Sequence, residues 1–125
     1  MRLRRNMSVE QPRSRMSSPR VRTARDALLD AAATAQLQPV REVICEPTRT
    51  QIVRALSAGQ LSVGDLAASL GRSKSATSQH LRVLREAGIV SASRRGRAVI
   101  YSLTTAPMVE ATVQMLNRAA SISAA

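Results

Sequence analysis

A glycine break between two short amphipathic patterns constrains the fold of this 125-residue chain more than any other feature. Before the break, Leu66 and Leu70 recur at helical spacing, and Gly71 ends the pattern. A second, longer helix is expected to begin at Ser73 and to continue to Gly88. Two helices joined by a turn of three or four residues that contains glycine form a helix-turn-helix.

The second of these helices has two faces of different character. Its apolar side is expected to consist of Ala76, Thr77, Leu81, Val83 and Leu84. Its exposed side is expected to present Lys74, Ser75, Ser78 and Gln79, which recur at i, i+1, i+4 and i+5. Lys74 has the chemistry to contact a phosphate or a guanine edge, and Gln79 can pair with adenine. Arg82 and Arg85 follow on the same helix and are expected to reach the DNA backbone.

A hairpin with a basic tip is predicted directly after this helix. Residues 89–93 and 99–103 have strand character, and the second segment is rich in β-formers. The tight turn between them contains Arg94, Arg95, Gly96 and Arg97. Clustered cations at a loop tip repel one another, and no nearby acid compensates them. A phosphate backbone or an A·T minor groove would do so, which predicts a second DNA contact.

The rest of the chain predicts a single small domain between two tails. We expect a basic arm at 1–22, a winged-helix domain at 23–120 and a frayed tail at 121–125. The fold class is therefore mainly α with a small β-hairpin. No segment is apolar enough to span a membrane, and no secretory signal is visible, so a cytoplasmic location is expected.

Proline and glycine residues mark the expected ends of the remaining helices of the domain. A helix is expected to begin near Thr23 and to end at Pro39, and a second one to begin at Pro47 and end at Gly59. Residues 60–62 fit a very short strand. A last amphipathic helix is expected to begin at Pro107, with an apolar face made of Met108, Val109, Val113 and Leu116.

The charge of the chain indicates a polyanionic partner. The formal net charge is +11, and residues 1–25 alone contain eight arginines and one glutamate, a net +7. This arm fits either a disordered tail or a segment that follows DNA phosphates. A start codon placed too early is a third alternative, because Met7 and Met16 are in frame.

These motifs together resemble the ArsR/SmtB family of bacterial winged-helix repressors. The resemblance covers roughly residues 40–116 and rests on Glu46 to Arg49, Leu61 to Ala67, Ser73 to Val90, Arg95 to Arg97 and Tyr101 to Leu103. It implies a homodimer joined through the first and last helices, and repression from a palindromic operator until an inducer releases the protein. It places the base contacts at Lys74, Ser75, Ser78 and Gln79, and the wing at 94–97.

The sequence departs from this family where many members bind metals. Ser62-Val63-Gly64 stands where a Cys-Val-Cys-like pattern supplies thiolates, and the last helix offers only Glu110 as a ligand. One His and one Cys are also too few for a four-ligand zinc site within one chain. No metal, cofactor or identifiable inducer is therefore predicted.

The remaining reactive residues favour no enzymatic chemistry. Cys45 precedes Pro47 near a helix start, so a redox role is conceivable, but we favour a small buried apolar residue because no second Cys is present. His80 is interpreted as a structural residue or an auxiliary DNA contact. No nucleophile–base pair, phosphate loop or paired carboxylate accompanies Asp65 and Glu46. One alternative to a specific repressor with an unknown inducer is a basic module that binds DNA or RNA without sequence preference. Another keeps the repressor fold but is controlled by a regulatory partner, with no small ligand.

Overall fold

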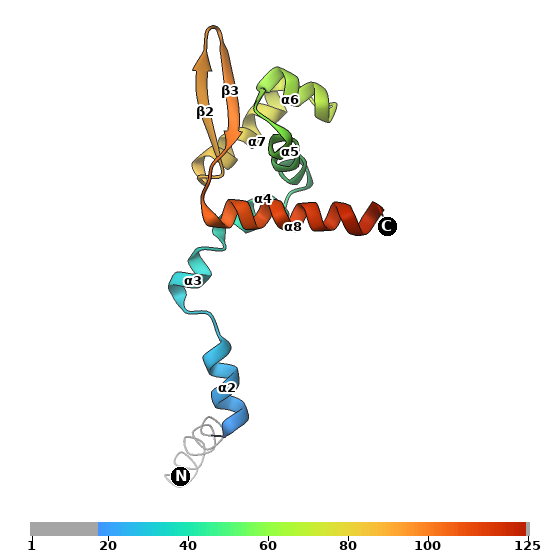
Figure 1. Ribbon diagram of the computed structural model, residues 1–125. Helices are drawn as coiled ribbons and strands as arrows, with labels where there is room; N and C mark the ends of the chain where they lie inside the picture. Colours follow the sequence, from blue (N-terminus) through green and yellow to red (C-terminus); the bar gives the residue numbers. More distant parts are fainter. Residues whose placement is uncertain (1–17, 125) are drawn as a thin grey trace, which may run out of the picture. The chain divides into compact units, whose positions relative to one another are not determined.

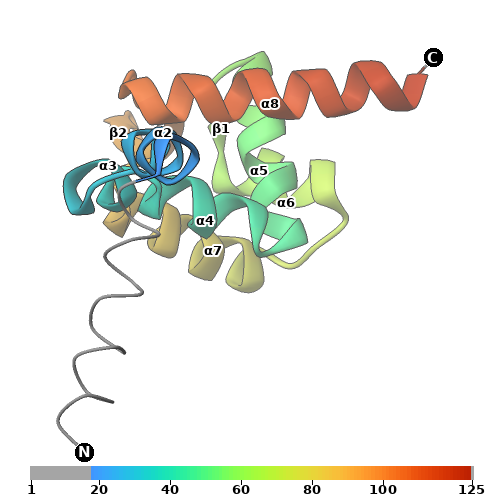
Figure 2. The same ribbon diagram turned by 90° about the horizontal axis from the view of Figure 1, so that it is seen from below.

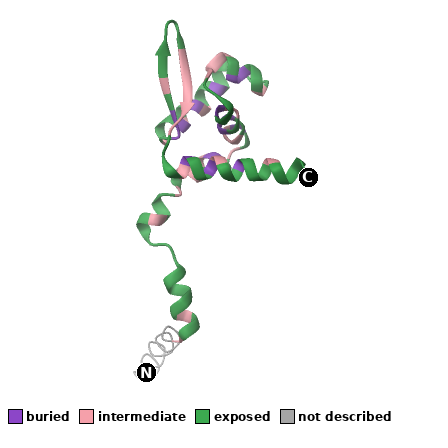
Figure 3. Cartoon of the chain, viewed as in Figure 1, coloured by how far each residue is buried: buried purple, intermediate pink, exposed green. Residues whose placement is uncertain are grey.

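The computed structural model describes residues 18–124, and the predictions for residues 1–17 lie outside this range. The chain divides into two compact units, one ending at Thr34 and the other beginning at Ala35. The first contains α2 (Pro19–Ala27), which Ser18 caps by accepting from the backbone N–H of Val21 at 3.3 Å. None of the α2 residues is buried (Figure 3). The domain limits predicted from the sequence stay predictions.

The prediction of a single helix between Thr23 and Pro39 is wrong. Leu28 ends α2 in an extended conformation, and a new helix, α3 (Ala31–Ala35), begins after Asp30, whose Oδ1 accepts from the N–H of Ala33 at 2.7 Å. Pro39 lies in the first turn of α4 (Gln38–Ile44) instead of ending a helix. Backbone N–H groups in a first helical turn have no intrahelical acceptor, so proline costs no hydrogen bond there.

The second unit contains the predicted winged arrangement. Its remaining elements are α5 (Pro47–Ala58), β1 (Leu61–Ser62), α6 (Val63–Leu70), α7 (Lys74–Glu86), β2 (Val90–Arg95), β3 (Ala98–Leu103) and α8 (Pro107–Ala124). Figure 1 shows β2 and β3 as a hairpin that projects beyond the helices, while α8 runs along the opposite side. The mainly helical fold with a small antiparallel sheet is confirmed.

The three strands form one sheet in the order β1-β3-β2, with both pairs antiparallel. Tyr101 on the central strand lies opposite Leu61 of β1 and Ala92 of β2. Arg95 lies opposite Ala98, so only two residues connect the long strands. The wing is therefore a tight hairpin held at its base by β1.

An aliphatic core joins these elements (Figure 3). It consists of Val43, Ile52, Val53, Leu56, Leu66, Leu81, Leu84, Ile89, Val90, Val109 and Leu116, with Tyr101 and Leu103 packed against it. Burial of each such side chain stabilises the fold by roughly 1.5–3 kcal/mol before entropy is counted. Since α5, α6 and α7 all contribute to this core, it fixes the position of the helix-turn-helix.

The last helix packs against α4 and α5 (Figure 2). Val109, Thr112 and Leu116 are its buried residues, whereas Met115 and Ile122 are exposed. The helix continues to Ala124, across the segment expected to be frayed. Among the described residues, no helix is both long enough and apolar enough to cross a membrane.

Candidate nucleic-acid interface

Local capping sets the geometry of the first helix of the motif. The Oγ of Ser62 accepts from the N–H of Asp65 at 3.1 Å, as the sequence predicts. At the other end, Gly71 adopts the left-handed region with φ of 64°, where glycine escapes the steric penalty of a side chain. The N–H of Arg72 then donates to the carbonyl of Ala67 at 3.0 Å. This closure aims the chain into the turn that precedes α7.

Ser73 begins the second helix and anchors its first turn. Its Oγ accepts from the N–H of Ala76 at 3.1 Å, which confirms it as the N-cap. The hydroxyl of Thr77 donates to the Ser73 carbonyl at 2.8 Å, and Thr77 is fully buried. The start of α7 is thus held both by the cap and by packing.

One stripe of α7 faces the core and leaves the opposite side in solvent. Thr77, Leu81 and Leu84 are each 0% exposed and lie at i, i+4 and i+7. Val83 is half-buried. The expectation that Ala76 is buried is wrong, because it lies one step around the helix from this stripe and is exposed. A methyl side chain is too small to indicate burial by itself.

The four predicted base-contacting residues all lie on the exposed side of α7. They are Lys74, Ser75, Ser78 and Gln79, and none of their side chains takes part in a hydrogen bond or ion pair within the described chain. Donors and acceptors that are free in this way are available to base edges and phosphates without breaking internal contacts. The structure brings the four together on the first two turns of one helix.

A close approach between α6 and α7 positions the first of these residues. A Cβ added to Gly64 would lie 3.3 Å from the Cε and 3.7 Å from the Nζ of Lys74. The side chain of Lys74 therefore passes over the backbone of α6 where glycine leaves room. The exposed Lys74 side chain thus lies next to the first turn of α6, where any residue larger than glycine would crowd it.

Arg82 is placed differently from the other predicted contacts. Its Nε lies 3.2 Å from Oε1 of Glu86, one turn further along α7, and the two side chains are 80% and 68% exposed. Exposed pairs of this kind contribute about 0.3–0.5 kcal/mol, so phosphates can compete for the guanidinium. Arg82 is accessible to a phosphate, but it would have to exchange its ion pair with Glu86 for the new contact.

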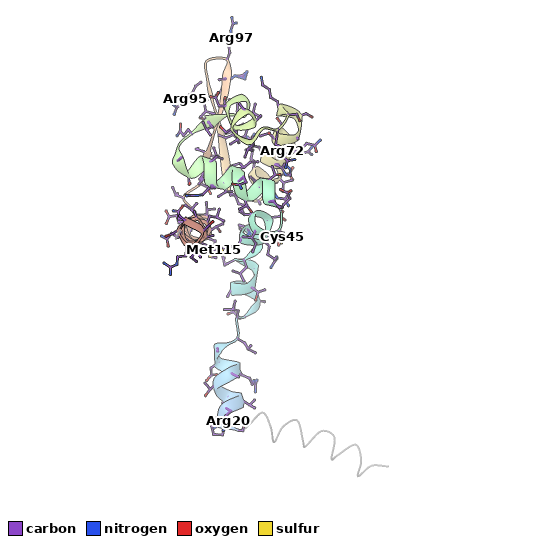
Figure 4. The ribbon with its side chains drawn as sticks, turned by 90° about the vertical axis from the view of Figure 1, so that its right-hand side faces the viewer. Arg20, Cys45, Arg72, Arg95, Arg97 and Met115 are labelled. Carbon is purple, nitrogen blue, oxygen red and sulfur yellow. The ribbon has the colours of Figure 1, made fainter. Side chains whose placement is uncertain are left out.

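The hairpin carries the remaining predicted contacts at its outer end. Arg94 and Arg95 are the last residues of β2, and Arg97 is in the turn (Figure 4). The turn was expected to contain all three, but Arg95 still pairs with Ala98. Gly96 takes the first turn position with φ of 62°, as a two-residue hairpin requires.

The three wing arginines point in more than one direction. Successive residues of a strand project to opposite faces, so Arg94 shares the face of Tyr101 and Leu103, while Arg95 lies on the other. All three are exposed. No acid forms an ion pair with them in the described part of the chain. The wing presents cations on both faces of the hairpin and at its tip.

Arg72 is a basic residue of this surface that the sequence reasoning missed. It is exposed in the turn between α6 and α7, directly before the cap residue Ser73 (Figure 4). Its position in the sequence could have indicated it, because Arg72 lies in the turn of the helix-turn-helix, directly before the helix predicted to read DNA. Arg72 lies beside the N-terminus of α7, whose helix dipole also attracts anions. The arginine and the helix end therefore favour a DNA phosphate at the same place.

The middle of α7 contacts another helix start. Nδ1 of His80 lies 3.8 Å from Oε2 of Glu46, the N-cap of α5. The same Oε2 accepts from the backbone N–H of Arg49 at 2.8 Å. This hydrogen bond lowers the pKa of the Glu46 carboxyl below its usual 4.5, against some desolvation, and the facing imidazole lowers it further. The structural interpretation of His80 fits this contact.

The position of Cys45 contradicts the prediction that it is buried and does not test its predicted redox role. It is exposed at the C-terminal cap of α4, so the favoured interpretation as a buried apolar residue is wrong. Val43 takes the buried position in that turn instead. The redox alternative stays a prediction. Within residues 18–124, no three His, Cys, Asp or Glu side chains lie close enough together to hold a metal ion.

Known sequences match this chain over the surface just described. A family model described as "Bacterial regulatory protein, arsR family" matches residues 46–92, from the cap of α5 into β2. The HTH-type transcriptional regulator NmtR of Mycobacterium tuberculosis is 43% identical over 77 residues, which are 62% of this chain and 64% of NmtR. The chain thus spans slightly less than two thirds of that relative.

Two further matches cover most of the related protein. The transcriptional repressor SdpR of Bacillus subtilis is 36% identical over 78 residues, which are 62% of this chain and 87% of SdpR. The solved structure of HlyU from Vibrio cholerae superposes with a TM-score of 0.66 at 32% identity, over 71% of this chain and 96% of HlyU. The resemblance and the winged helix-turn-helix fold expected from the sequence are confirmed. The chain belongs to the arsR family of bacterial regulatory proteins.

Proposed function

We propose that this chain is a transcriptional repressor that binds double-stranded DNA as a homodimer. The observation that carries the proposal is the exposed polar face on the first two turns of α7, next to the three exposed wing arginines. Neither the side chains of this face nor the wing arginines pair with any residue in the described part of the chain. A helix presented in this way fits the major groove, and a basic wing fits the adjacent backbone. Such a regulator acts in the cytoplasm, where bacterial DNA lies, and the proposal assigns it no catalytic chemistry.

The side chains divide into base-reading and backbone-contacting groups. Gln79 and Lys74 have the chemistry to read adenine and guanine edges, with Ser75 and Ser78 as adaptable partners. Arg82 and the wing residues Arg94, Arg95 and Arg97 supply phosphate contacts, which fix register without reading sequence. Specificity is therefore assigned to α7, and salt-dependent affinity is assigned mainly to the arginines.

The homodimer rests on the exposed apolar residues of the last helix. Met115 and Ile122 are 43% and 65% exposed on α8, and covering such side chains is favourable. A two-fold dimer would present two reading helices to half-sites about one helical turn apart, which predicts a palindromic operator. Size-exclusion chromatography with light scattering tests this part, and a monomer at micromolar concentration would contradict it.

A mobility-shift series on the promoter of the chain's own gene tests the groove assignment. Gln79→Ala should relax base preference at one position per half-site, at a cost of about 1–3 kcal/mol for the preferred base. Arg95→Ala should weaken binding to all DNA sequences alike. It should also reduce the slope of the logarithm of affinity against the logarithm of salt concentration by about one per protomer. Arg41→Ala removes an equal charge from the exposed side of α4, outside α7, the wing and the proposed dimer face of α8, and serves as the control. Unchanged binding in both test variants would refute the assignment.

The net charge of +11 favours one competing function, a basic module that binds nucleic acid without sequence preference. Competition between the promoter duplex and an excess of unrelated duplex separates the two. The repressor should bind the promoter duplex about 10³-fold or more tighter than unrelated duplex. Equal affinity for the two duplexes supports the basic module. A promoter–reporter assay then distinguishes repression, as in the name of SdpR, from activation, as in the curated name of HlyU from Vibrio cholerae.

A further inference from the structure

A groove on the side of the domain formed by α5 and α8 has the size of a small-molecule site. It lies between the C-terminal end of α5, the connection from β3 to α8 and the N-terminal half of α8, and its volume is about 500 Å³. Pockets of roughly 300–1,000 Å³ commonly bind small molecules. Its apolar side chains are those of Leu56, Ala58, Leu103, Val109 and Val113.

The charge of this groove is opposite to that of the whole chain. Glu110 is the one ionisable side chain among its lining residues, all of which lie in the described part of the chain. Although the chain has a net charge of +11, no Lys or Arg lines the groove, and Glu110 forms no ion pair with any described residue. Its other polar lining comes from the hydroxyl or amide side chains of Ser57, Gln60, Ser102, Thr104, Thr105 and Gln114.

We propose that this groove binds a small organic cation, a primary amine in its ammonium form that carries a compact hydrocarbon group. The ammonium would pair with Glu110, and the hydrocarbon would lie against the half-buried side chains of Leu103 and Val113. The hydroxyl and amide groups at the rim can accept the remaining ammonium hydrogens. The inference rests on the proposed function, because it identifies the groove as the effector site of the repressor.

Hydrogen bonds connect the groove to both DNA-contacting elements. Thr104 lines the groove, and its Oγ1 donates to the carbonyl of Gly88 at 2.7 Å, two residues after the end of α7. The N–H of Thr104 also donates to the carbonyl of Ile89 at 2.9 Å. Ser102, a second lining residue, has its Oγ 3.1 Å from that of Ser91 on β2. A ligand that shifts the β3–α8 connection therefore acts on the end of α7 and on the wing.

Isothermal titration of the full chain with matched probes tests the ligand chemistry. The probes are cyclohexylmethylammonium, neutral cyclohexylmethanol and cyclohexanecarboxylate. We expect the ammonium to bind most tightly and the carboxylate most weakly. Glu110→Gln should weaken ammonium binding by about fivefold, the upper end for an exposed ion pair, and leave the alcohol unchanged. Glu86→Gln, a charge loss on α7 outside the groove, is the control.

Three results of the titration would overturn the ligand assignment. The first is equal binding of the ammonium and the alcohol, and the second is an ammonium affinity that Glu110→Gln leaves unchanged. No binding of any probe would also overturn it, because a second copy of the chain or a side-chain rearrangement would then fill the groove.

A mobility shift with and without the ammonium probe separates this inference from the proposed function. By linkage, a probe that weakens DNA binding must itself bind less tightly to the DNA complex by the same factor. Glu110→Gln should bind DNA as the unmodified chain does, but should need about fivefold more probe for release. If the probe binds and DNA affinity does not change, the effector role is overturned. If no variant binds DNA specifically, the repressor proposal fails while the titration still decides the site.

Discussion

Nδ1 of His80, in the middle of α7, lies 3.8 Å from Oε2 of Glu46, the carboxylate that caps α5. One side chain therefore both closes the start of a core helix and faces the helix proposed to read DNA. The Oε2 atom also accepts from the N–H of Arg49 at 2.8 Å. The Glu46 carboxylate therefore lies between the start of α5 and the middle of α7.

Stability should depend on pH through Glu46. Its pKa is lowered in the folded chain, so the ionised form stabilises folding above the unfolded value near 4.5, and this contribution disappears as pH falls through the lower folded pKa. Glu46→Gln should thus lower the melting temperature at pH 7, and the difference from the unmodified chain should shrink below pH 4.5. Circular dichroism melts from pH 7 to pH 3 measure this, with Asp26→Asn as control. A difference that is constant with pH would contradict the assignment.

The two faces of α7 should respond differently to truncation. Leu81 is 0% exposed, and Leu81→Ala should destabilise folding by about 2–5 kcal/mol through lost burial and a cavity. Ser78→Ala removes an exposed hydroxyl on the other face and should change stability by less than about 0.5 kcal/mol. Urea unfolding gives both numbers. A large loss in Ser78→Ala would show that its face is packed and not available to DNA.

The wing turn should resist side chains because of its backbone conformation. Gly96 has φ of 62°, so Gly96→Ala should cost about 1–2 kcal/mol even though the space around it is open. Gly59→Ala is the matched control, since Gly59 also has open space but an extended backbone that any residue adopts. Thermal melts compare the two. Equal effects would indicate that the turn has rearranged to a different type.

The Cys45 thiol should be available in the folded protein. Because Cys45 is exposed at the end of α4, Ellman's reagent should titrate one thiol per chain without denaturant. Cys45→Ser should give no signal, since the sequence contains no other cysteine. A thiol that reacts only after unfolding would mean that this surface is covered in solution, for instance by a second copy of the chain.

The sequence predicts the helix-turn-helix and the wing well because their signals are local. Ser62 and Ser73 cap the helices that follow them, and Gly71 and Gly96 take the positive φ values expected at turns. These effects depend on neighbouring residues only, so they can be recognised without the fold. The polar face of α7 follows from helical periodicity in the same way, once Leu81 is assigned to the core.

The errors arise where two local interpretations compete or where burial depends on distant residues. Pro39 fits both the end of one helix and the first turn of the next, and the choice depends on packing of α4 against α8. Ala76 and Cys45 are small enough for either environment, so their exposure reflects the neighbouring elements and not their own chemistry. The groove around Glu110 needs three separate elements and has no sequence motif.

The composition of the sheet provides an intrinsic optical probe of the DNA-binding end. The chain contains one tyrosine and neither tryptophan nor phenylalanine, and Tyr101 lies between Leu61 and Ala92 on the central strand. Phenol fluorescence and near-ultraviolet dichroism of the unlabelled protein therefore originate at the base of the wing. Changes in tyrosine fluorescence on adding duplex or ammonium probe would report on this one location without any introduced dye.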